Sequence, residues 1–176
     1  MDQTAARSST RRPVVFRDGL GRRCRVPDQS GNEKLEILCL RSELTVSEQF
    51  EPALRERVAR LASFQSASFS RLKTVERLRD QTSTLVLVSE TTHGTRLADL
   101  IAIAERRGFG LDGTAAWSLV RQLVSAIATL HEEVADVAHG AIAAERIVIT
   151  ADARLVVVEH ALASALKHVQ IGRAHV

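Results

Sequence analysis

The sequence predicts an α+β fold, in which a small antiparallel sheet with one helix is followed by further helices and a β-hairpin. Short apolar runs of four to seven residues, typical of strands, alternate with longer stretches in which apolar residues recur every three or four positions, as in amphipathic helices. In addition, 45% of the 176 residues are apolar, which is enough for a globular core. This composition argues against disorder of the whole chain.

Residues 34–92 are predicted to form the small sheet and its helix. "LEILCL" (35–40) is an apolar run suited to a buried strand. In "SEQFEPALRERVARLASF" the apolar residues follow helical spacing, with Ser47 a candidate cap and Pro52 tolerated in the first turn. "RLKTVERLRD" and "STLVLVS" read as two strands joined by a turn at "DQTS".

Residues 93–169 are predicted to form the second part. "RLADLIAIAERRG" is a short helix that ends at Gly108. "GTAAWSLVRQLVSAIATLHEE" is a long helix, and its apolar residues spread widely enough to predict burial on most sides, with Trp117 in the core. "RIVIT" (146–150) and "RLVVV" (154–158), joined by "ADA", are predicted to pair as a hairpin.

The two ends of the chain differ from the rest. Residues 1–33 are basic and are predicted to be weakly ordered, with a turn at "RDGLGRR". Much of the positive charge lies there, at Arg7, Arg11, Arg12, Arg17, Arg22, Arg23 and Arg25. Codons for "IGRAHV" can spell the start of a common sequencing adapter, so we interpret residues 170–176 as an adapter-derived tail and exclude them from the fold.

Composition argues against several classes of protein. The net charge is only +3, and five Phe, one Trp and no Tyr offer little base stacking, which argues against a nucleic-acid partner. The chain has no apolar run of eighteen residues and no signal-peptide core, which predicts no membrane segment and a cytoplasmic location. Cys24 and Cys39 lack metal-ligand spacing, so we expect reduced thiols and no metal site.

The order of elements and four local stretches resemble the protein kinase domain. "STLVLVSETTHGTRLADLI" is similar to the last small-lobe strand, the hinge and the helix that opens the large lobe, and "LVRQLVSAIATLHEE" to the helix before the catalytic loop. "HGAIAAERIVI" aligns without a gap to HRDLKPENILI, and "LVVVEHALA" to the strand that carries DFG. The resemblance covers roughly residues 34–165 and implies a kinase-like fold cut short within the large lobe.

At the positions that the resemblance marks as functional, the chain departs from the family. His139 matches the loop histidine, Ala141 stands at the catalytic Asp and Ala143 at the loop Lys, while Arg146 stands at the metal-binding Asn. A methyl group accepts no proton, and a guanidinium has only donors and would repel Mg²⁺. The DFG positions are occupied by Glu159, His160 and Ala161, and only the first retains a carboxylate. We predict that Arg146 pairs with Glu159 as an internal cation in place of magnesium.

Further losses lie upstream. "LEILCL" contains no Lys, since Lys34 precedes it and Arg41 follows it, and Arg57 occupies the helix position where the resemblance implies the partnering Glu. "DGLGRRCRV" lacks the spacing of a glycine-rich phosphate loop. Phosphoryl transfer depends on positioning and charge neutralisation, so losses on five separate elements predict that the scaffold is kept and the catalytic machinery is not.

Three functions are compatible with these observations. The first is a bacterial-type pseudokinase, a signalling module without catalytic residues, cofactor or metal that binds or regulates an unidentified protein partner. The second is a divergent kinase-like domain that still binds ATP through backbone groups at the hinge, at Ser89, Glu90, Thr91 and Thr92. The third is a helical DNA-binding or scaffold domain in which "GTAAWSLVRQLVSAI" mimics a helix-turn-helix element. The pseudokinase explains the coordinated losses best.

Overall fold

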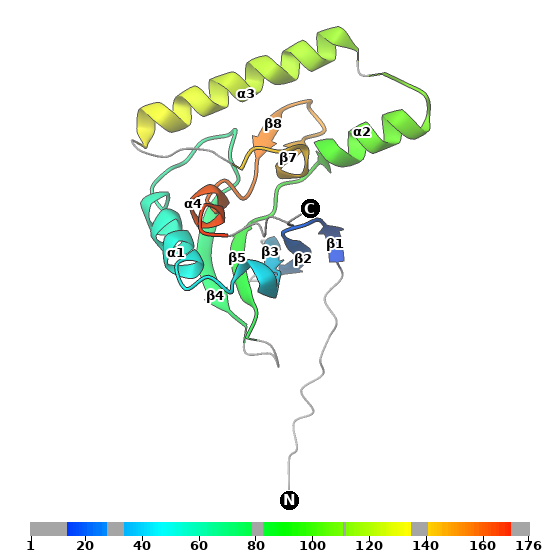
Figure 1. Cartoon of the computed structure of the whole chain (residues 1–176). Helices are drawn as coiled ribbons and strands as arrows, with labels where there is room; N and C mark the ends of the chain where they lie inside the picture. Colours follow the sequence, from blue (N-terminus) through cyan, green and yellow to red (C-terminus); the bar gives the residue numbers. More distant parts are fainter. Residues whose placement is uncertain (1–13, 28–33, 79–82, 111, 135–140, 170–176) are drawn as a thin grey trace, which may run out of the picture.

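An antiparallel sheet of five strands forms the first part of the molecule (Figure 1). The computed structural model describes residues 14–27, 34–78, 83–110, 112–134 and 141–169. The strand order is β1-β2-β3-β5-β4. The strands are β1 (Val14–Arg17), β2 (Gly21–Pro27), β3 (Lys34–Leu40), β4 (Leu72–Arg77) and β5 (Leu85–Glu90).

One helix, α1 (Phe50–Arg60), covers one face of this sheet, and a short 3-10 turn, η1 (Ser42–Leu44), precedes it. Because side chains alternate along a strand, Leu38 and Leu40 of β3 face the main core together with Phe50 and Leu54 of α1. The opposite face of β3 and β5 forms a smaller apolar cluster that includes Cys39. Both faces of the central strands are therefore buried, as the continuous apolar runs predict.

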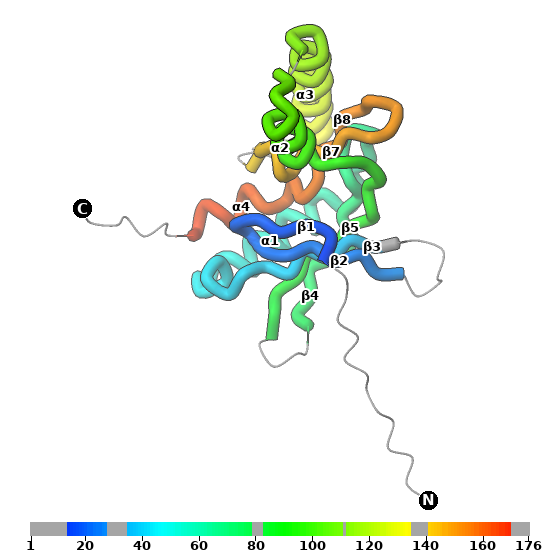
Figure 2. The backbone as a smooth tube through the Cα atoms, turned by 90° about the vertical axis from the view of Figure 1, so that its right-hand side faces the viewer, coloured from blue at the N-terminus to red at the C-terminus, as the bar shows by residue number. Residues whose placement is uncertain are grey.

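The second part of the molecule follows the chain from β5 through a short strand, β6 (Thr95–Arg96), into α2 (Leu97–Arg106) and the long α3 (Gly113–Glu133). The 3-10 turn η2 (Ala144–Arg146), the strands β7 (Ile147–Ile149) and β8 (Leu155–Val157), and the short helix α4 (Leu162–Leu166) complete it. A second sheet has the order β6-β7-β8. Figure 2 shows α3 standing on the side of this hairpin that faces away from the five-stranded sheet.

Two sets of backbone contacts join the parts. The amide of Ser70 donates to the carbonyl of Val157 at 2.9 Å, and the amide of Val157 donates to Ser68 at 2.8 Å. Gly94 lies beside β7 with φ +152°, and a Cβ atom there would lie 2.3 Å from the carbonyl oxygen of Ile149. A residue without a side chain is therefore required where the chain crosses from one part to the other.

The predicted helices and strands between residues 35 and 158 are confirmed, and α2 is followed by Gly108 with φ +69°, as expected for a helix stop. The expectation of weak order before residue 34 needs correction. Residues 14–27 form the β1–β2 hairpin, which continues the sheet through seven paired positions between β2 and β3. The turn predicted at "RDGLGRR" is the turn of this hairpin.

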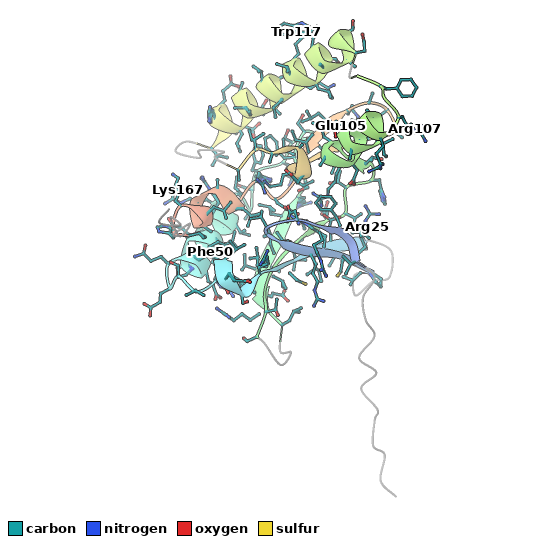
Figure 3. The ribbon with its side chains drawn as sticks, turned by 45° about the vertical axis from the view of Figure 1, so that its right-hand side comes forward. Arg25, Phe50, Glu105, Arg107, Trp117 and Lys167 are labelled. Carbon is teal, nitrogen blue, oxygen red and sulfur yellow. The ribbon has the colours of Figure 1, made fainter. Side chains whose placement is uncertain are left out.

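The prediction for the long helix is only partly correct. Helix α3 buries Ala126 and Leu130 against the core, and the Gln122 side chain accepts a hydrogen bond from the amide of Leu155 at 2.9 Å. Its other face is open, since Trp117 is 65% exposed, and Val120 and Val124 are also exposed. Figure 3 shows Trp117 on the side of α3 away from the rest of the molecule. Trp117 is therefore not a core residue here.

Some expectations fall outside the part of the chain that the structure describes: those for residues 1–13 and 170–176, for most of the "DQTS" turn, and for His139. Among the described residues, no helix combines the length and the apolar character needed to cross a membrane.

Candidate functional site

A buried ion pair lies where the five-stranded sheet adjoins the β6-β7-β8 sheet, and it includes Glu159, one of the residues at the kinase-like functional positions. Arg23 of β2 is 0% exposed, and its Nε and Nη2 atoms donate to Oε1 and Oε2 of Glu159 at 2.7 and 2.6 Å. Its Nη1 atom forms a further ion pair with Asp18 in the β1–β2 turn. Both oxygens of Glu159 are thus engaged by one guanidinium, in the two-pronged geometry that makes such pairs strong.

Glu159 is held in an uncommon backbone conformation. It follows β8 directly after Val158, is 2% exposed and has φ +57°. A residue with a side chain keeps a positive φ only where its surroundings impose it. Here the Arg23 contact and the adjoining core residues, Ala161 and Leu162, fix the side chain and the backbone on either side.

A second ion pair extends this site. Arg96 of β6 donates through Nη2 to Oε1 of Glu36 on β3 at 2.5 Å, and through Nη1 to the carbonyl of Glu145 at 2.5 Å. The same Nη2 atom lies 3.6 Å from Oε1 of Glu159. The two ion pairs therefore form one network, and each joins a strand of the small lobe to the large lobe.

One aromatic ring contacts both arginines. The Phe16 ring centroid is 5.3 Å from the guanidinium carbon of Arg23 and 4.6 Å from that of Arg96, so the ring contacts both cations. Cation–π contacts at this distance are attractive and strengthen when water is excluded. Phe16 thus packs strand β1 against the ion pairs. We call the set of Phe16, Arg23, Glu36, Arg96 and Glu159 the interlobe network.

The charges in the interlobe network shift the pKa of their partners. Burial raises the pKa of Glu36, and the nearby charge of Glu159 adds to this against the opposing effect of Arg96. Burial would also raise the pKa of Asp18, but its hydrogen bond and ion pair with Arg23 prevail and lower it. Burial alone would lower the pKa of Arg23, whereas Glu159 and Asp18 together raise it. Arg23 therefore stays charged.

The predicted pair between Arg146 and Glu159 is wrong. Arg146 ends the η2 turn, its amide donates to Ala143 at 2.8 Å, and its Nε atom donates to the carbonyl of Ala141, so the guanidinium folds back onto its own loop. The internal cation at Glu159 is Arg23, which is 136 positions away in the sequence. Local sequence reasoning gave no signal for it, because the "GRRCR" stretch reads as part of a basic arm.

The other catalytic-loop and DFG positions are apolar or buried. Ala141 and Ala161 belong to the hydrophobic core, so neither presents a functional group. His160 is buried, and its ring packs edge-on against Phe69 and Phe64 at centroid distances of 4.9 and 6.1 Å. Burial and the charge of Arg57 lower its pKa to about 4. His160 is therefore a neutral core residue at neutral pH.

The described side chains of β3, residues 35–40, include no cation, and the charged group that β3 contributes to this site is the carboxylate of Glu36. Arg57, at the position where the resemblance implies a Glu, is buried on α1 and lines a pocket against α4.

No group of three or more His, Cys, Asp or Glu side chains suited to a metal ion occurs among the described residues.

Of the hinge candidates, only Ser89 is shown beside a residue of this site among the described contacts. The amide of Glu90 donates to the carbonyl of Arg71 at 2.9 Å, and its carboxylate lies 2.6 Å from Nζ of Lys73. Ser89 is buried and pairs with Glu36 across the sheet. A pocket of about 520 Å³ is lined by Glu90, Thr91 and Thr92 on one side and by residues 64–67 and 69–71 on another. None of the residues at catalytic positions lines it.

Magnesium does not fit the side chains at this site. The carboxylate at the implied metal position already accepts two hydrogen bonds from Arg23, and Arg146, at the other implied ligand position, has only donors. A divalent cation at Glu159 would lie beside the charges of Arg23 and Arg96. The local electrostatics therefore oppose a second cation.

Comparison with solved structures shows which fold these elements form. The kinase domain of Mycobacterium tuberculosis PknI superposes with a TM-score of 0.71 at 13% identity, covering 86% of this chain and 58% of that domain. A double mutant of the same domain gives 0.74, with 86% and 59% covered. The maize SIRK1 (sucrose-induced receptor kinase 1) kinase domain bound to AMP-PNP gives 0.65 at 14% identity, with 92% and 56% covered.

This chain thus spans somewhat less than three fifths of the kinase domains that it resembles. No protein-family model and no curated protein matches its sequence. The alternative of a helical DNA-binding domain has no support, because α3 packs on the β7–β8 hairpin and the chain superposes on kinase domains. The chain has a protein kinase-like fold, comprising the small lobe and part of the large lobe.

Proposed function

We propose that this chain is a catalytically inactive kinase-like module that acts by binding or regulating another protein. The observation that carries the proposal is the buried pair between Arg23 and Glu159. Phosphoryl transfer uses a carboxylate at this position to hold magnesium against the nucleotide phosphates. Here the carboxylate is neutralised by a side chain of the same protein, so its charge is already compensated in the folded chain.

The missing base supports the same conclusion. The methyl group of Ala141 accepts no proton, and it lies in the hydrophobic core. Loss of a general base typically lowers a rate by about 10²- to 10⁴-fold. Arg146 adds a cation that bonds to the same loop, at the second position where the resemblance implies a metal ligand. The substitutions at Ala141 and Arg146 act on proton transfer and on metal binding, which are separate requirements.

The interlobe network also supports a binding role. Arg23 and Glu36 belong to the small lobe, and Glu159 and Arg96 belong to the large lobe, so the two ion pairs hold the lobes in one arrangement without a nucleotide. A surface that is already ordered loses less conformational entropy when a partner binds. The same network that disables catalysis therefore preorganises the outer surface.

The experiment that tests the proposal is a phosphotransfer assay on the purified chain with radiolabelled ATP and Mg²⁺ or Mn²⁺, using the chain itself and a generic protein substrate as acceptors. We expect no incorporation above that of a heat-denatured control. Incorporation above that control would show that the chain transfers phosphate, and would overturn the proposal. ATP binding without phosphotransfer would favour the nucleotide-binding alternative.

A further inference from the structure

Exposed apolar side chains gather on α3 and on the segment that leads into it. Nine large apolar side chains are exposed among the described residues, and six of these lie between positions 100 and 124: Leu100, Ile103, Phe109, Trp117, Val120 and Val124. A hollow of about 620 Å³ is lined by residues of α3, from Trp117 to Ser125. An exposed apolar surface of this kind typically marks a contact site for another protein.

The exposed apolar residues of α3 form one stripe along the helix. Trp117, Val120 and Val124 recur at intervals of three and four residues, so they lie on one face. The exposed Ala128 continues this face by one further turn. Figure 3 shows Trp117 on the side of α3 away from the rest of the molecule. The stripe is asymmetric, because its largest side chain lies near the start of α3 and its smallest near the end.

The charged residues on the same face are also arranged asymmetrically. Arg121 follows Trp117 by four residues and is exposed. Glu132 follows Ala128 by four residues and is exposed as well. Residues four positions apart are neighbours on a helix surface, so both charges border the stripe. The first half of this face therefore carries a cation, and the second half carries an anion.

We propose that the outer face of α3 binds the same face of a second copy of this chain, with the two helices antiparallel. A two-fold contact brings one surface against itself, so that surface must complement itself. The antiparallel arrangement places residues 117–121 of one copy opposite residues 128–132 of the other. Trp117 then packs against the small Ala128, and Arg121 approaches Glu132. The two-fold axis passes between Val124 and Ser125.

The parallel arrangement of the same two faces is less favourable. It would bring Trp117 against Trp117 and leave the small side chains opposite each other, so the surfaces would not interlock. It would also bring Arg121 against Arg121 and Glu132 against Glu132, and like charges repel. Charges at the rim of an interface contribute mainly to orientation rather than to affinity. Size and charge therefore both favour the antiparallel pair.

The dimension of α3 sets the expected strength of the contact. Its 21 residues span about 31 Å. One pair of helices of this length makes a smaller interface than the roughly 1,600 Å² of a standard complex. We therefore expect a reversible dimer with a dissociation constant of about 10 to 100 µM.

This inference goes beyond the proposed function and shares no residue with the interlobe network. Phosphotransfer by the chain would overturn the proposed function and leave the α3 contact untouched. A chain that stays monomeric would remove the α3 contact and leave the interlobe network as it is.

The test is sedimentation equilibrium of the whole chain from about 1 to 300 µM, a range that brackets the expected dissociation constant. Trp117 is the single tryptophan of the chain, so its fluorescence reports on this surface alone. We expect a transition from monomer to dimer. Over the same concentrations, the emission of Trp117 should shift to the blue and its quenching by acrylamide should fall, because the ring becomes shielded from water.

The variant Val124→Glu tests the place of the contact. Val124 is 61% exposed, so the substitution should leave folding intact, but in the dimer the two new carboxylates would meet beside the axis. We expect the dimer to be at least about tenfold weaker. The matched control is Val46→Glu, a position outside α3 that is 79% exposed. It should form dimers as the wild type does.

A charge exchange tests the orientation. Arg121→Glu places a carboxylate against Glu132 of the second copy at two symmetric positions, and should weaken the dimer at least about fivefold. Arg121→Glu/Glu132→Arg restores opposite charges and should return the dissociation constant to within about threefold of the wild type. Far-UV circular dichroism verifies that each variant is folded.

The proposal is overturned if the chain is monomeric at 300 µM, or if it grows beyond dimers. A dimer that leaves the emission of Trp117 unchanged, or that Val124→Glu and Val46→Glu weaken equally, would place the contact on another surface. Equal weakening in the single and double charge variants would contradict the antiparallel arrangement.

Discussion

Replacing Glu159 by Gln should destabilise the protein by about 3 kcal/mol. The substitution removes the charge that compensates Arg23, whose side chain is completely buried. Two charge-assisted hydrogen bonds to Arg23, at 2.7 and 2.6 Å, are weakened or lost. Such bonds contribute about 1.5 to 3 kcal/mol each, or about 3 to 6 kcal/mol together. The loss should lie near the lower end of this range, because Asp18 still pairs with Arg23. Breaking a buried pair by removing one partner typically costs about 3 to 5 kcal/mol.

The assay is equilibrium unfolding in urea followed by far-UV circular dichroism, because the exposed Trp117 is a poor fluorescent probe of the core. A loss of about 3 kcal/mol corresponds to a fall of roughly 6 to 12 °C in melting temperature for a chain of this size. The control is Arg154→Gln, which breaks an ion pair with Asp152 whose side chains are 65% and 57% exposed. It should cost less than about 1 kcal/mol.

The reasoning is refuted if Glu159→Gln unfolds within about 1 kcal/mol of the wild type at an unchanged urea dependence. The double variant Arg23→Met/Glu159→Met provides a second check. Because it removes both charges, it should be more stable than the sum of the two single losses predicts. Additive losses would show that the two side chains are not coupled.

Two further predictions concern stability. Burial and Arg57 lower the pKa of His160 to about 4 in the folded chain. As the pH falls from 6.5 towards 4, His160 is therefore protonated in the unfolded chain before it is protonated in the folded chain. The stability that the neutral ring contributes is fully present above pH 6.5 and is lost over this range. Between pH 7 and pH 4, the wild type should lose roughly 3 kcal/mol more than His160→Phe in urea unfolding, and parallel profiles would contradict the assignment. Gly94→Ala should destabilise by more than about 1 kcal/mol, since its Cβ would lie 2.3 Å from the oxygen of Ile149. Gly113→Ala, where a Cβ meets nothing within 4 Å at the start of α3, should be neutral or stabilising, and equal losses in the two variants would refute the steric argument.

Helices and strands could be predicted from the sequence where the spacing of their apolar residues matches the faces that are buried. β5 is apolar from Leu85 to Val88 because both of its faces are covered, and α1 places Phe50, Leu54 and Val58 on one side because one side meets the sheet. The kinase-like order of elements followed from these patterns together with the catalytic-loop alignment. The substitutions at Ala141 and Arg146 are likewise visible in the sequence itself.

The partners of the functional residues could not be predicted in this way. Arg23 looks like a residue of a solvated basic arm, and only folding brings it to Glu159. The choice of Arg146 as the partner of Glu159 failed because proximity in the alignment says nothing about where a long side chain points. Trp117 shows the opposite error, since an apolar residue at helical spacing is buried only if another element covers it.

The measurement that tests the central claim most directly is isothermal titration calorimetry of the whole chain with ATP, with and without Mg²⁺. If Arg23 neutralises the carboxylate of Glu159, adding Mg²⁺ should not change the heat of titration, and no binding should be detected at millimolar ATP. Binding that requires Mg²⁺, with a dissociation constant below about 1 mM, would show that the carboxylate leaves Arg23 for a metal, and would contradict the account.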